Sequence, residues 1–373
     1  MQQPQMKKEL STHEVASGLG KWAISKGLVE GLDAATEAFY LADVEKVGFS
    51  ADAEAILRAK GIHSISYNEP GHTIYIYTKK KIANKDLQVL PSNFLGVGIA
   101  YPQGSVDPIG REVNKPQGAV CSIHKTAQAE HYTCGSSISP GNDCSAGTMG
   151  ALVRDKQDKL MGLTNNHVTA LCSHTLVGTP ILAPGVLDVG PYTMAPITLG
   201  FHVKALEMKI GTVGNLDIQS NLDAAVFELP NESLVSSMQG NAFDTPSETG
   251  SPVEGMRVSK VGRTTGHTEG RIVSRELRPV SIKYSVAGHG FSAFILFGNV
   301  YSVHGTTGPF SAAGDSGSLV VEIDAKGTPI RAVGLLFADG SDSSAPGDMR
   351  TFILPLEPIL EGLEVKLVGG HNV

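Results

Sequence analysis

Hydrophobic residues recur with helical spacing over the first 60 positions of the chain. Ser11 can cap a helix that continues to Leu28, because its hydroxyl can accept a backbone N–H of the first turn. A second helical pattern covers residues 33–47. Ser50 precedes a third pattern over residues 51–60, where acidic side chains near the start favour a helix N-terminus. The spacing therefore predicts three helices.

Alternating polarity replaces the helical pattern after the third helix. Residues 62–67 and 73–77 are rich in β-branched and aromatic side chains, and the turn residues 68–71 join them, which predicts a hairpin. Residues 94–100 indicate a third strand. A polar segment rich in Pro and Gly follows over residues 101–116. We expect a small α+β domain that ends with this segment.

Short apolar runs between Gly and Pro clusters dominate the remaining chain. Such regularly punctuated runs predict an all-β barrel or sandwich. The runs cover residues 149–154, 160–164, 224–229, 257–261, 294–303, 318–323 and 332–337. Residues 356–363 have the pattern of a closing helix. We therefore predict two domains, an α+β domain at 1–116 and a mainly β domain at 117–373.

Composition and charge restrict the possible functions of this 373-residue chain. Hydrophobic residues make up 41% and 43 residues are Gly, which indicates a folded, turn-rich protein. The net charge is −7, so a strong basic field for nucleic acid is missing. The sequence shows no secretory signal or membrane helix, and four cysteines are too few for a disulfide framework. We expect a cytoplasmic protein with free thiols that binds neither nucleic acid nor membrane.

Three short segments carry residue types that fit nucleophilic catalysis. Gly-Asp-Ser-Gly at 314–317 immediately precedes an apolar run, and its glycines allow a tight turn that presents Ser316. A serine hydroxyl needs an imidazole to accept its proton and a carboxylate to orient that imidazole. His167 follows one strand-like run and Asp223 precedes another. The expected catalytic residues are therefore His167, Asp223 and Ser316.

The order of these residues separates two classes of serine hydrolase. An α/β-hydrolase needs Gly two residues after the nucleophile, but residue 318 is Ser, and its catalytic residues run in the order Ser, acid, His. Here the order is His, Asp, Ser. Each residue alone has an ordinary alternative, since Asp223 could cap a strand and His167 could be structural. Together, at the edges of three β-runs, they favour catalysis.

These segments resemble the His, Asp and Ser motifs of the chymotrypsin-like (trypsin-fold) serine proteases. Residues 262–266, Gly-Arg-Thr-Thr-Gly, are similar to a turn of bacterial members, and residues 333–337 resemble the strand beside the primary specificity pocket. The similarity covers residues 117–365 and is closer to a bacterial group of intracellular trypsin-like proteins with a Gly-Ser-Ser-Ile segment, here 135–138. The resemblance implies a chymotrypsin-like double β-barrel that hydrolyses peptide bonds through an acyl-enzyme intermediate.

The same resemblance implies further roles in the nucleophile loop. The amides of Gly314 and Ser316 are expected to hold the oxyanion, and the carboxylate of Asp315 is expected to pair internally and shape that site. Neither a metal nor a cofactor is needed for this mechanism. Residue 318 is Ser where the family motif has a third glycine. The alternative function is a catalytically silent binding scaffold with the same fold.

Substrate preference is expected to depend on the residue six positions before the nucleophile, where trypsin-like members carry an acid. This chain has Phe310 there, which predicts preference for an uncharged residue before the scissile bond. The alternative is that Phe310 belongs to the core. The other expected substrate-binding residues are Leu335, Leu336 and Phe337. His267 and His304 are candidates for binding an acidic side chain of the substrate.

Residues 1–116 offer no site for activation through a newly released N-terminus, as occurs in trypsinogen. Cleavage after Arg111 would expose Glu112, and the bond after Lys115 precedes Pro116. We therefore expect this domain to remain attached. It would then regulate the protease, recruit its substrate or bind a regulatory protein.

Two cysteines and two histidines lie close together in sequence, at spacings that a zinc site could use. Cys121 and His124 are three residues apart, as are His131 and Cys134. The paired Cys-x2-Cys arrangement of well-defined zinc sites is absent from this segment. Packed or loop thiols are therefore favoured over a metal site.

Overall fold

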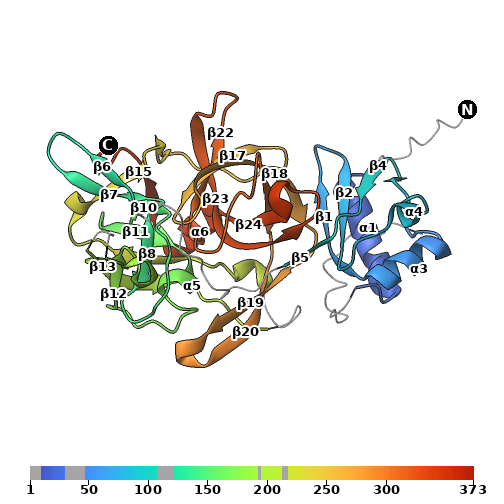
Figure 1. Ribbon diagram of the computed structural model, residues 1–373, viewed down its shortest axis with the longest axis horizontal. Coiled ribbons are helices and arrows are strands. Elements are labelled where there is room, and N and C mark those ends of the chain that lie inside the picture. Colours follow the sequence, from blue (N-terminus) through green and yellow to red (C-terminus); the bar gives the residue numbers. More distant parts are fainter. Residues whose placement is uncertain (1–9, 30–46, 107–120, 192–194, 212–216) are drawn as a thin grey trace, which may run out of the picture. The chain divides into compact units, whose positions relative to one another are not determined.

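The computed structural model of the protein describes residues 10–29, 47–106, 121–191, 195–211 and 217–373 (Figure 1). The chain forms two compact units, and each unit is built from several chain segments. Unit 1 comprises residues 1–105, 274–278 and 342–344, and unit 2 comprises residues 106–273, 279–341 and 345–373. The expected boundary near residue 116, and all but the last residue of the helix expected over 33–47, lie outside the described residues.

Unit 1 has the expected mixture of helices and strands. Helix α1 (Thr12–Ser25) begins at a capping box, in which Ser11 Oγ accepts the Glu14 N–H at 3.1 Å and Glu14 Oε2 accepts the Ser11 N–H at 2.8 Å. Helix α3 (Ala51–Lys60) begins where the sequence predicted and ends at Gly61, whose φ of 71° favours glycine. The other elements are β1 (Ile62–Asn68), β2 (Thr73–Thr78), α4 (Asn84–Leu87), β3 (Asn93–Phe94), β4 (Val97–Ala100) and β5 (Gly104–Val106).

The sheet of unit 1 has the order β1–β2–β4–β3 and gains a strand from much later in the chain. Residues 275–276, at the end of β18 (Gly266–Glu276), pair with β1, and the Ser66 hydroxyl donates to Ser274 Oγ at 2.9 Å. The single strand expected over residues 94–100 is instead the β3–β4 hairpin, because the two residues between these strands have positive φ. The sheet of the α+β unit is thus completed by a distant segment that no local sequence pattern predicts to lie there.

Six strands of unit 2 close into a barrel. β17 pairs with both β18 and β22, so the order β17–β22–β23–β24–β21–β18 returns to its first strand. Alternate side chains fill the interior, and Val320 and Ile353 there are 0% exposed. The bounds are β17 (Arg257–Gly262), β21 (Tyr301–Gly305), β22 (Leu319–Ile323), β23 (Pro329–Asp342) and β24 (Met349–Pro355).

An earlier set of strands in unit 2 curls into a half-barrel with the order β25–β10–β11–β14–β13–β12–β8–β9. Its bounds are β8 (Ser137–Pro140), β9 (Gly147–Thr148), β10 (Ala151–Arg154), β11 (Leu160–Thr164), β12 (Pro180–Ala183), β13 (Ile197–Ala205), β14 (Ala225–Glu228) and β25 (Lys366–Val368). Helix α6 (Leu356–Leu363) is the predicted closing helix. Unit 2 therefore has the mainly β, double β-barrel architecture that the sequence predicted.

Two smaller sheets accompany the barrels. One joins β6 (Ile123–Lys125), β7 (Glu130–Cys134), β15 (Val235–Gln239) and β16 (Phe243–Asp244), and the other is the hairpin of β19 (Val280–Val286) and β20 (Phe291–Phe297). The run 294–303, expected as one strand, is divided between β20 and β21. Asn299 has a φ of 54° and interrupts the extended backbone there.

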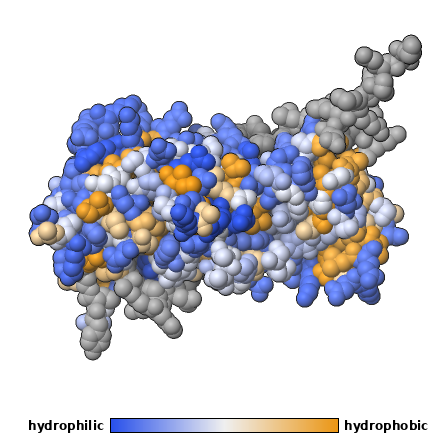
Figure 2. Space-filling view, turned by 90° about the horizontal axis from the view of Figure 1, so that it is seen from above, coloured by the Kyte–Doolittle hydropathy of each residue, from blue (hydrophilic) through white to orange (hydrophobic). Residues whose placement is uncertain are grey.

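Hydrophilic residues prevail on the face shown in Figure 2, and hydrophobic residues form smaller groups between them. Within the described ranges, the helices are too short or too polar to cross a membrane. The apolar side chains are instead collected in the cores of the two units.

Candidate active site

The pairing of two half-barrel strands brings His167 and Asp223 together. β11 ends at Thr164, which pairs with Ala225 at the start of the antiparallel strand β14. His167 follows Thr164 by three residues and Asp223 precedes Ala225 by two, so both extend beyond the same end of the strand pair. The strand register therefore explains why two residues far apart in sequence meet.

The Asp223 carboxylate holds His167 at two points. His167 Nδ1 lies 2.5 Å from Asp223 Oδ2, and the His167 backbone N–H donates to Asp223 Oδ1 at 3.0 Å. The side chain of Asp223 is 0% exposed, and that of His167 is 10% exposed. Because the contact with the carboxylate places a proton on Nδ1, the neutral imidazole has its free lone pair on Nε2.

A tyrosine from the β19–β20 hairpin also contacts this carboxylate. Tyr284 OH donates to Asp223 Oδ2 at 2.8 Å, and the ring centroids of Tyr284 and His167 lie 5.6 Å apart. Asn165 Nδ2 donates to the Asp223 backbone oxygen at 2.6 Å. Burial and the charge of Asp223 raise the pKa of Tyr284 well above its ordinary value, so the phenol remains a donor.

The residues after His167 form a braced turn. Helix α5 (Asn166–Thr169) leads into Leu171, Cys172 and Ser173, whose φ values of 48°, 56° and 68° are unusual for residues other than glycine. Asn166 Oδ1 accepts the Ser173 N–H at 2.8 Å, and Asn166 Nδ2 donates to Ser173 Oγ at 2.8 Å. These two bonds stabilise the turn next to the imidazole.

Ser316 lies in a loop that packs against the end of β11. We call residues 312–318, before β22, the Ser316 loop. The Thr148 N–H donates to the Ser316 backbone oxygen at 2.9 Å, and Thr164 Oγ1 donates to the Thr148 oxygen at 2.7 Å. Gly317 has a φ of 94°, and a Cβ at this position would lie 2.3 Å from Thr164 Oγ1. Only glycine permits this close approach of the loop to the end of β11.

The Asp315 carboxylate is buried within the Ser316 loop and pairs internally. Lys260 Nζ lies 3.2 Å from Asp315 Oδ2, and both side chains are 0% exposed. Asp315 Oδ1 accepts the Thr264 N–H at 2.7 Å, and Oδ2 accepts the Thr265 hydroxyl at 2.6 Å and the Ala312 N–H at 3.0 Å. Burial lowers the pKa of Lys260, and the ion pair opposes this shift. The internal pairing implied for Asp315 is present, with Lys260 as the cation.

A second buried ion pair lies next to the Ser316 loop. Arg263 Nε donates to Asp188 Oδ2 at 2.8 Å, and Arg263 Nη2 donates to Asp188 Oδ1. Ser137 Oγ donates to the same Oδ2 at 2.5 Å. Gly314 has a φ of 101°, and a Cβ there would lie 2.7 Å from Arg263 Nη1. Among the described residues, no acceptor is paired with the amide N–H of Gly314 or of Ser316.

Ser318 stands where the resembling motif has a third glycine. Its Oγ is buried and donates to the Asp315 backbone oxygen at 2.6 Å. Gly262 lies opposite and makes room for this hydroxyl, since a Cβ on Gly262 would lie 2.6 Å from Ser318 Oγ. The serine therefore closes the nucleophile turn with a hydrogen bond.

The four residues expected to bind substrate are packed into hydrophobic cores. Phe310 and Leu336 are 1% and 2% exposed inside the closed barrel, whereas Leu335 and Phe337 are 0% exposed in the largest core cluster. Neighbours on a strand point to opposite faces, which divides the three strand residues between these cores. None of the four side chains presents a surface to a substrate. Phe310 thus follows the core alternative.

The two histidines considered for binding an acidic side chain lie on the closed barrel. His267 in β18 is exposed, its Nε2 lies 2.8 Å from Ser259 Oγ, and its ring packs edge-on against Phe243 with centroids 5.9 Å apart. His304 in β21 is half-buried. His267 is therefore a surface residue of the barrel.

The four residues weighed as zinc ligands have other contacts. His124 and His131 pair across the β6–β7 hairpin. His131 is engaged at both ring nitrogens, by Thr126 Oγ1 at 3.0 Å and by the Ser233 backbone oxygen at 2.7 Å. Burial raises the pKa of the Cys134 thiol. Over the described part of the chain, no three His, Cys, Asp or Glu side chains are grouped to hold a metal ion.

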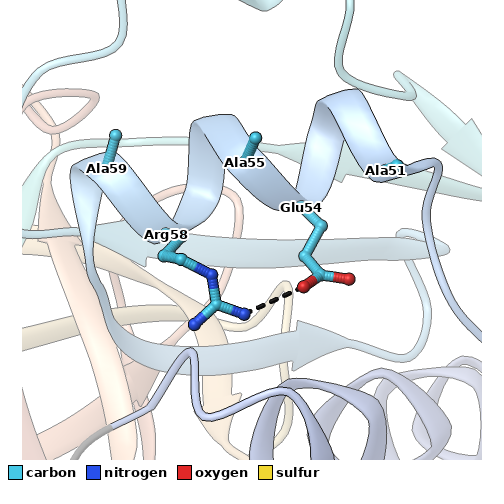
Figure 3. Close-up of a pocket in the computed structure, with 5 residues that line it drawn as sticks. All are labelled: Ala51, Glu54, Ala55, Arg58 and Ala59. Atoms are coloured by element: carbon cyan, nitrogen blue, oxygen red, sulfur yellow. Dashed lines mark hydrogen bonds and ion pairs between the residues drawn. The ribbon is translucent and has the colours of Figure 1, made fainter.

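A surface pocket of unit 1 lies along helix α3 and is separate from this chemistry (Figure 3). Ala51, Ala55 and Ala59 lie one turn apart and leave space beside the helix. Glu54 and Arg58 line the pocket and bind each other, with Arg58 Nη2 donating to Glu54 Oε1 at 2.9 Å. The pocket lining contains neither a nucleophile nor an imidazole, so it offers no group for hydrolysis.

Sequence reasoning missed two residues that contact the candidate site. Lys260 lies in the apolar run 257–261, and a cation inside a buried strand indicates a buried counter-ion. Tyr284 lies in residues 280–286, where buried and exposed residues alternate, although this run was not among the predicted strands. In both cases the local sequence pattern marks the residue, but it does not identify the carboxylate that the residue contacts.

The chain is similar to bacterial chymotrypsin-like serine proteases of known structure. Thermobifida fusca Protease A is 17% identical, with a TM-score of 0.41 over 64% of this chain and 98% of that chain. Nocardiopsis protease is 17% identical, with a TM-score of 0.39 over 63% and 97%. A glutamic acid-specific serine protease that uses a histidine triad in substrate binding is also 17% identical, with a TM-score of 0.39 over 63% and 100%. At these identities the likeness concerns the fold. No family model and no curated protein matches the sequence.

Proposed function

We propose that the protein is a serine endopeptidase in which His167, Asp223 and Ser316 act together. The observation that carries this proposal is the buried Asp223 carboxylate bound to both Nδ1 and the backbone N–H of His167, with the Ser316 loop packed on the same strand end. A binding scaffold needs neither an imidazole oriented in this way nor a serine presented by a tight turn. The arrangement supports acyl transfer.

In the proposed reaction, Ser316 Oγ attacks the carbonyl carbon of a peptide bond while His167 Nε2 accepts the hydroxyl proton. Nε2 is available because Nδ1 is bound to Asp223. His167 then donates this proton to the leaving amine as the C–N bond breaks. A water molecule next attacks the acyl-enzyme and gives a proton to Nε2, which returns it to Ser316 Oγ as the ester bond breaks and the carboxylic acid leaves. The buried Asp223 carboxylate stabilises the imidazolium that forms in each step, because a low-dielectric site strengthens the attraction.

The amides of Gly314 and Ser316 are the proposed donors to the oxyanion. Their N–H groups have no acceptor among the described residues, and the left-handed conformation of Gly314 sets the direction of the chain between them. The buried carboxylate of Asp315, with Lys260 as its cation, holds the turn that joins the two amides. Donors fixed before the reaction stabilise developing charge without reorganisation.

We also propose that residues 1–105 remain part of the active enzyme and serve to regulate it or to recruit substrate. Activation in the style of trypsinogen would supply a new N-terminus to pair with Asp315, but Lys260 already occupies that role. Residues 274–278 belong to the sheet of unit 1. A cut between 106 and 120 would therefore leave the N-terminal fragment paired with a strand of the downstream chain.

This part of the proposal is tested by following intact mass and peptidase rate together during incubation of the full chain. The full-length protein is expected to hydrolyse peptides without a change in mass. Activity that emerges only after cleavage between 106 and 120 would contradict it.

For the substrate, we propose an uncharged residue before the scissile bond. Phe310 stands where basic-specific enzymes carry an acid, and it is buried in the barrel core, so this position supplies no carboxylate to pair with a substrate Lys or Arg. Burial of a substrate ammonium or guanidinium without a counter-ion is unfavourable by roughly several kcal/mol. A peptide-library cleavage profile dominated by Lys or Arg would exclude this preference.

The decisive experiment is labelling with a fluorophosphonate probe, which reacts with an activated serine. The wild-type protein is expected to be labelled, and Ser316→Ala is expected to remain unlabelled. Ser251→Ala is the matched control, because Ser251 is an exposed serine whose hydroxyl donates to Glu357 Oε2 at 3.0 Å, and the variant retains Ser316. Circular dichroism verifies that each variant is folded. A folded wild-type protein that neither reacts with the probe nor hydrolyses casein would favour the binding scaffold instead.

A further inference from the structure

We propose that Tyr284 is a positioning residue that acts through Asp223, by holding the carboxylate oxygen that faces His167. The inference rests on the proposed function and extends it to the β19–β20 hairpin, a sheet separate from both barrels. Tyr284 does not exchange a proton with the substrate in this role. It determines how the carboxylate meets the imidazole.

The two oxygens of Asp223 have different partners. Oδ1 accepts the His167 backbone N–H at 3.0 Å, whereas Oδ2 lies 2.5 Å from His167 Nδ1 and accepts the Tyr284 hydroxyl at 2.8 Å. Three contacts therefore fix the plane of a carboxylate that is 0% exposed. Without the phenol hydroxyl, one acceptor position of Oδ2 would be empty in a site that water does not reach.

The phenol is itself fixed by packing. Tyr284 is 0% exposed, its ring centroid lies 6.0 Å from that of Phe297, and Phe297 lies 4.9 Å from Phe337 in the largest core cluster. Since burial raises the pKa of Tyr284, the hydroxyl carries its proton throughout the pH range in which peptidases are assayed. The donor is therefore present whether the imidazole is neutral or charged.

The hairpin is attached to both segments that supply the His–Asp pair. Near the hairpin turn, His174 of the loop after α5 lies 5.3 Å from His289 and 4.7 Å from Phe291, measured between ring centroids. Further along β20, Asn221 Nδ2 donates to the Leu296 backbone oxygen at 2.9 Å. Asn221 precedes the carboxylate by two residues. The hairpin thus contacts the segment that follows His167 and the segment that precedes Asp223, as well as the carboxylate itself.

Removal of the hydroxyl has a predictable electrostatic effect. The hydrogen bond from Tyr284 offsets part of the negative charge of Asp223, so its loss strengthens the carboxylate's attraction for a charged imidazole. Among the described residues, Cys172 also interacts with the Asp223 charge, and its thiol is kept neutral because burial, and then that charge, raise its pKa. The acid limb of the kcat/KM profile is therefore expected to move to higher pH.

The test is Tyr284→Phe, which keeps the ring and removes only the hydroxyl. We expect kcat to fall about 10- to 100-fold, the range carried by a hydrogen bond to a charged group, with KM little changed and the acid limb of kcat/KM at higher pH. Tyr77→Phe is the matched control in unit 1, since Tyr77 is buried and its hydroxyl donates to Asp342 Oδ2 at 2.9 Å. The control is expected to retain the wild-type kcat and pH profile.

A double-variant cycle tests whether Tyr284 acts through Asp223. If it does, the combination of Tyr284→Phe with Asp223→Asn loses no more activity than Asp223→Asn alone. Additive losses would overturn the positioning role. So would a wild-type kcat and an unshifted acid limb in Tyr284→Phe.

Unnatural side chains cover the case in which Tyr284→Phe does not fold. 4-Aminophenylalanine at position 284 keeps a donor, and 4-methoxyphenylalanine keeps an oxygen without a donor. We expect the 4-aminophenylalanine variant to have a kcat near that of the wild type and the 4-methoxyphenylalanine variant to show the pH shift. The opposite pattern would overturn the proposal. A wild-type protein without Ser316-dependent hydrolysis would instead exclude the proposed function, so the two failures are distinguishable.

Discussion

The two loops that carry the candidate catalytic side chains are both organised around buried carboxylates, but with different partners. In the turn around His167, the Asp223 carboxylate binds the imidazole, a backbone N–H and the neutral phenol of Tyr284. In the Ser316 loop, the Asp315 carboxylate is paired with the ammonium of Lys260. One carboxylate thus has a phenol as its donor where the other has an ammonium group.

This difference fits the different demands of the proposed reaction on the two loops. The imidazole gains a positive charge in each step, so a permanent cation bound to its carboxylate would oppose that gain. A neutral phenol orients the carboxylate without this repulsion. The turn that carries Ser316 must instead keep one shape. A buried ion pair maintains that shape, because separation of its two charges is strongly unfavourable. The electrostatics of each loop therefore follow from whether its charge has to change.

The largest expected effect comes from removal of Ser316 or His167, the proposed catalytic groups of the two loops. Ser316→Ala and His167→Ala are each expected to lower kcat by about 10⁶-fold, and the double variant by no more than either one, because the groups act as a unit. Hydrolysis of a peptide ester measures the rates, and thermal unfolding verifies the fold. A double variant much slower than both single variants would show that the two loops act independently.

Asp223→Asn is the next largest, because it preserves the shape of the carboxylate site and changes its charge. The amide can donate to His167 Nδ1 and thereby favour the wrong tautomer, with an expected loss of about 10⁴-fold in kcat, the size seen in trypsin-type enzymes. Asp324→Asn is the matched control, since its side chain accepts backbone N–H groups in a turn at 2.8 Å and the amide oxygen can do the same. Equal losses in both variants would contradict the special role of Asp223.

Lys260→Met tests the cation of the Ser316 loop. It leaves the buried Asp315 charge without its counter-ion, so the free energy of unfolding is expected to fall by about 3–5 kcal/mol. If the oxyanion donors shift as a result, kcat falls by about 10²–10³-fold. Lys156→Met is the control, because Lys156 and Glu364 form an exposed pair at 2.5 Å that water screens and that contributes little to stability. Urea denaturation would contradict the prediction if both variants lost the same stability.

The smallest expected effect is a change in the alkaline pH dependence of stability. The pKa of Tyr284 is raised in the folded protein, whereas a tyrosine in the unfolded chain titrates at about pH 10. Above that pH the folded state binds more protons than the unfolded state, so the free energy of unfolding decreases as pH rises. Tyr284→Phe should make this decrease shallower by about 1.4 kcal/mol per pH unit. Identical slopes in urea denaturation of the two proteins would contradict it.

Local sequence signals predicted the elements that depend on nearby residues. The helices beginning after Ser11 and over 51–60 follow from their caps, and the closing helix over 356–363 has the predicted bounds. Short apolar runs marked most strands of the closed barrel. One error occurs where a single backbone conformation divides an apolar run, at Asn299, because left-handed residues other than glycine carry little sequence signal.

The sequence by itself determined the chemical types and their order, namely a histidine, an aspartate and a serine at the edges of β-runs. It also carried the glycines that the tight nucleophile turn requires. Only the tertiary structure decided which groups meet. The β11–β14 register joins His167 to Asp223, a hairpin 61 residues further along supplies Tyr284, and Lys260 reaches Asp315 across 55 residues. Such contacts depend on strand pairing between distant segments, and propensity and periodicity describe only neighbours along the chain.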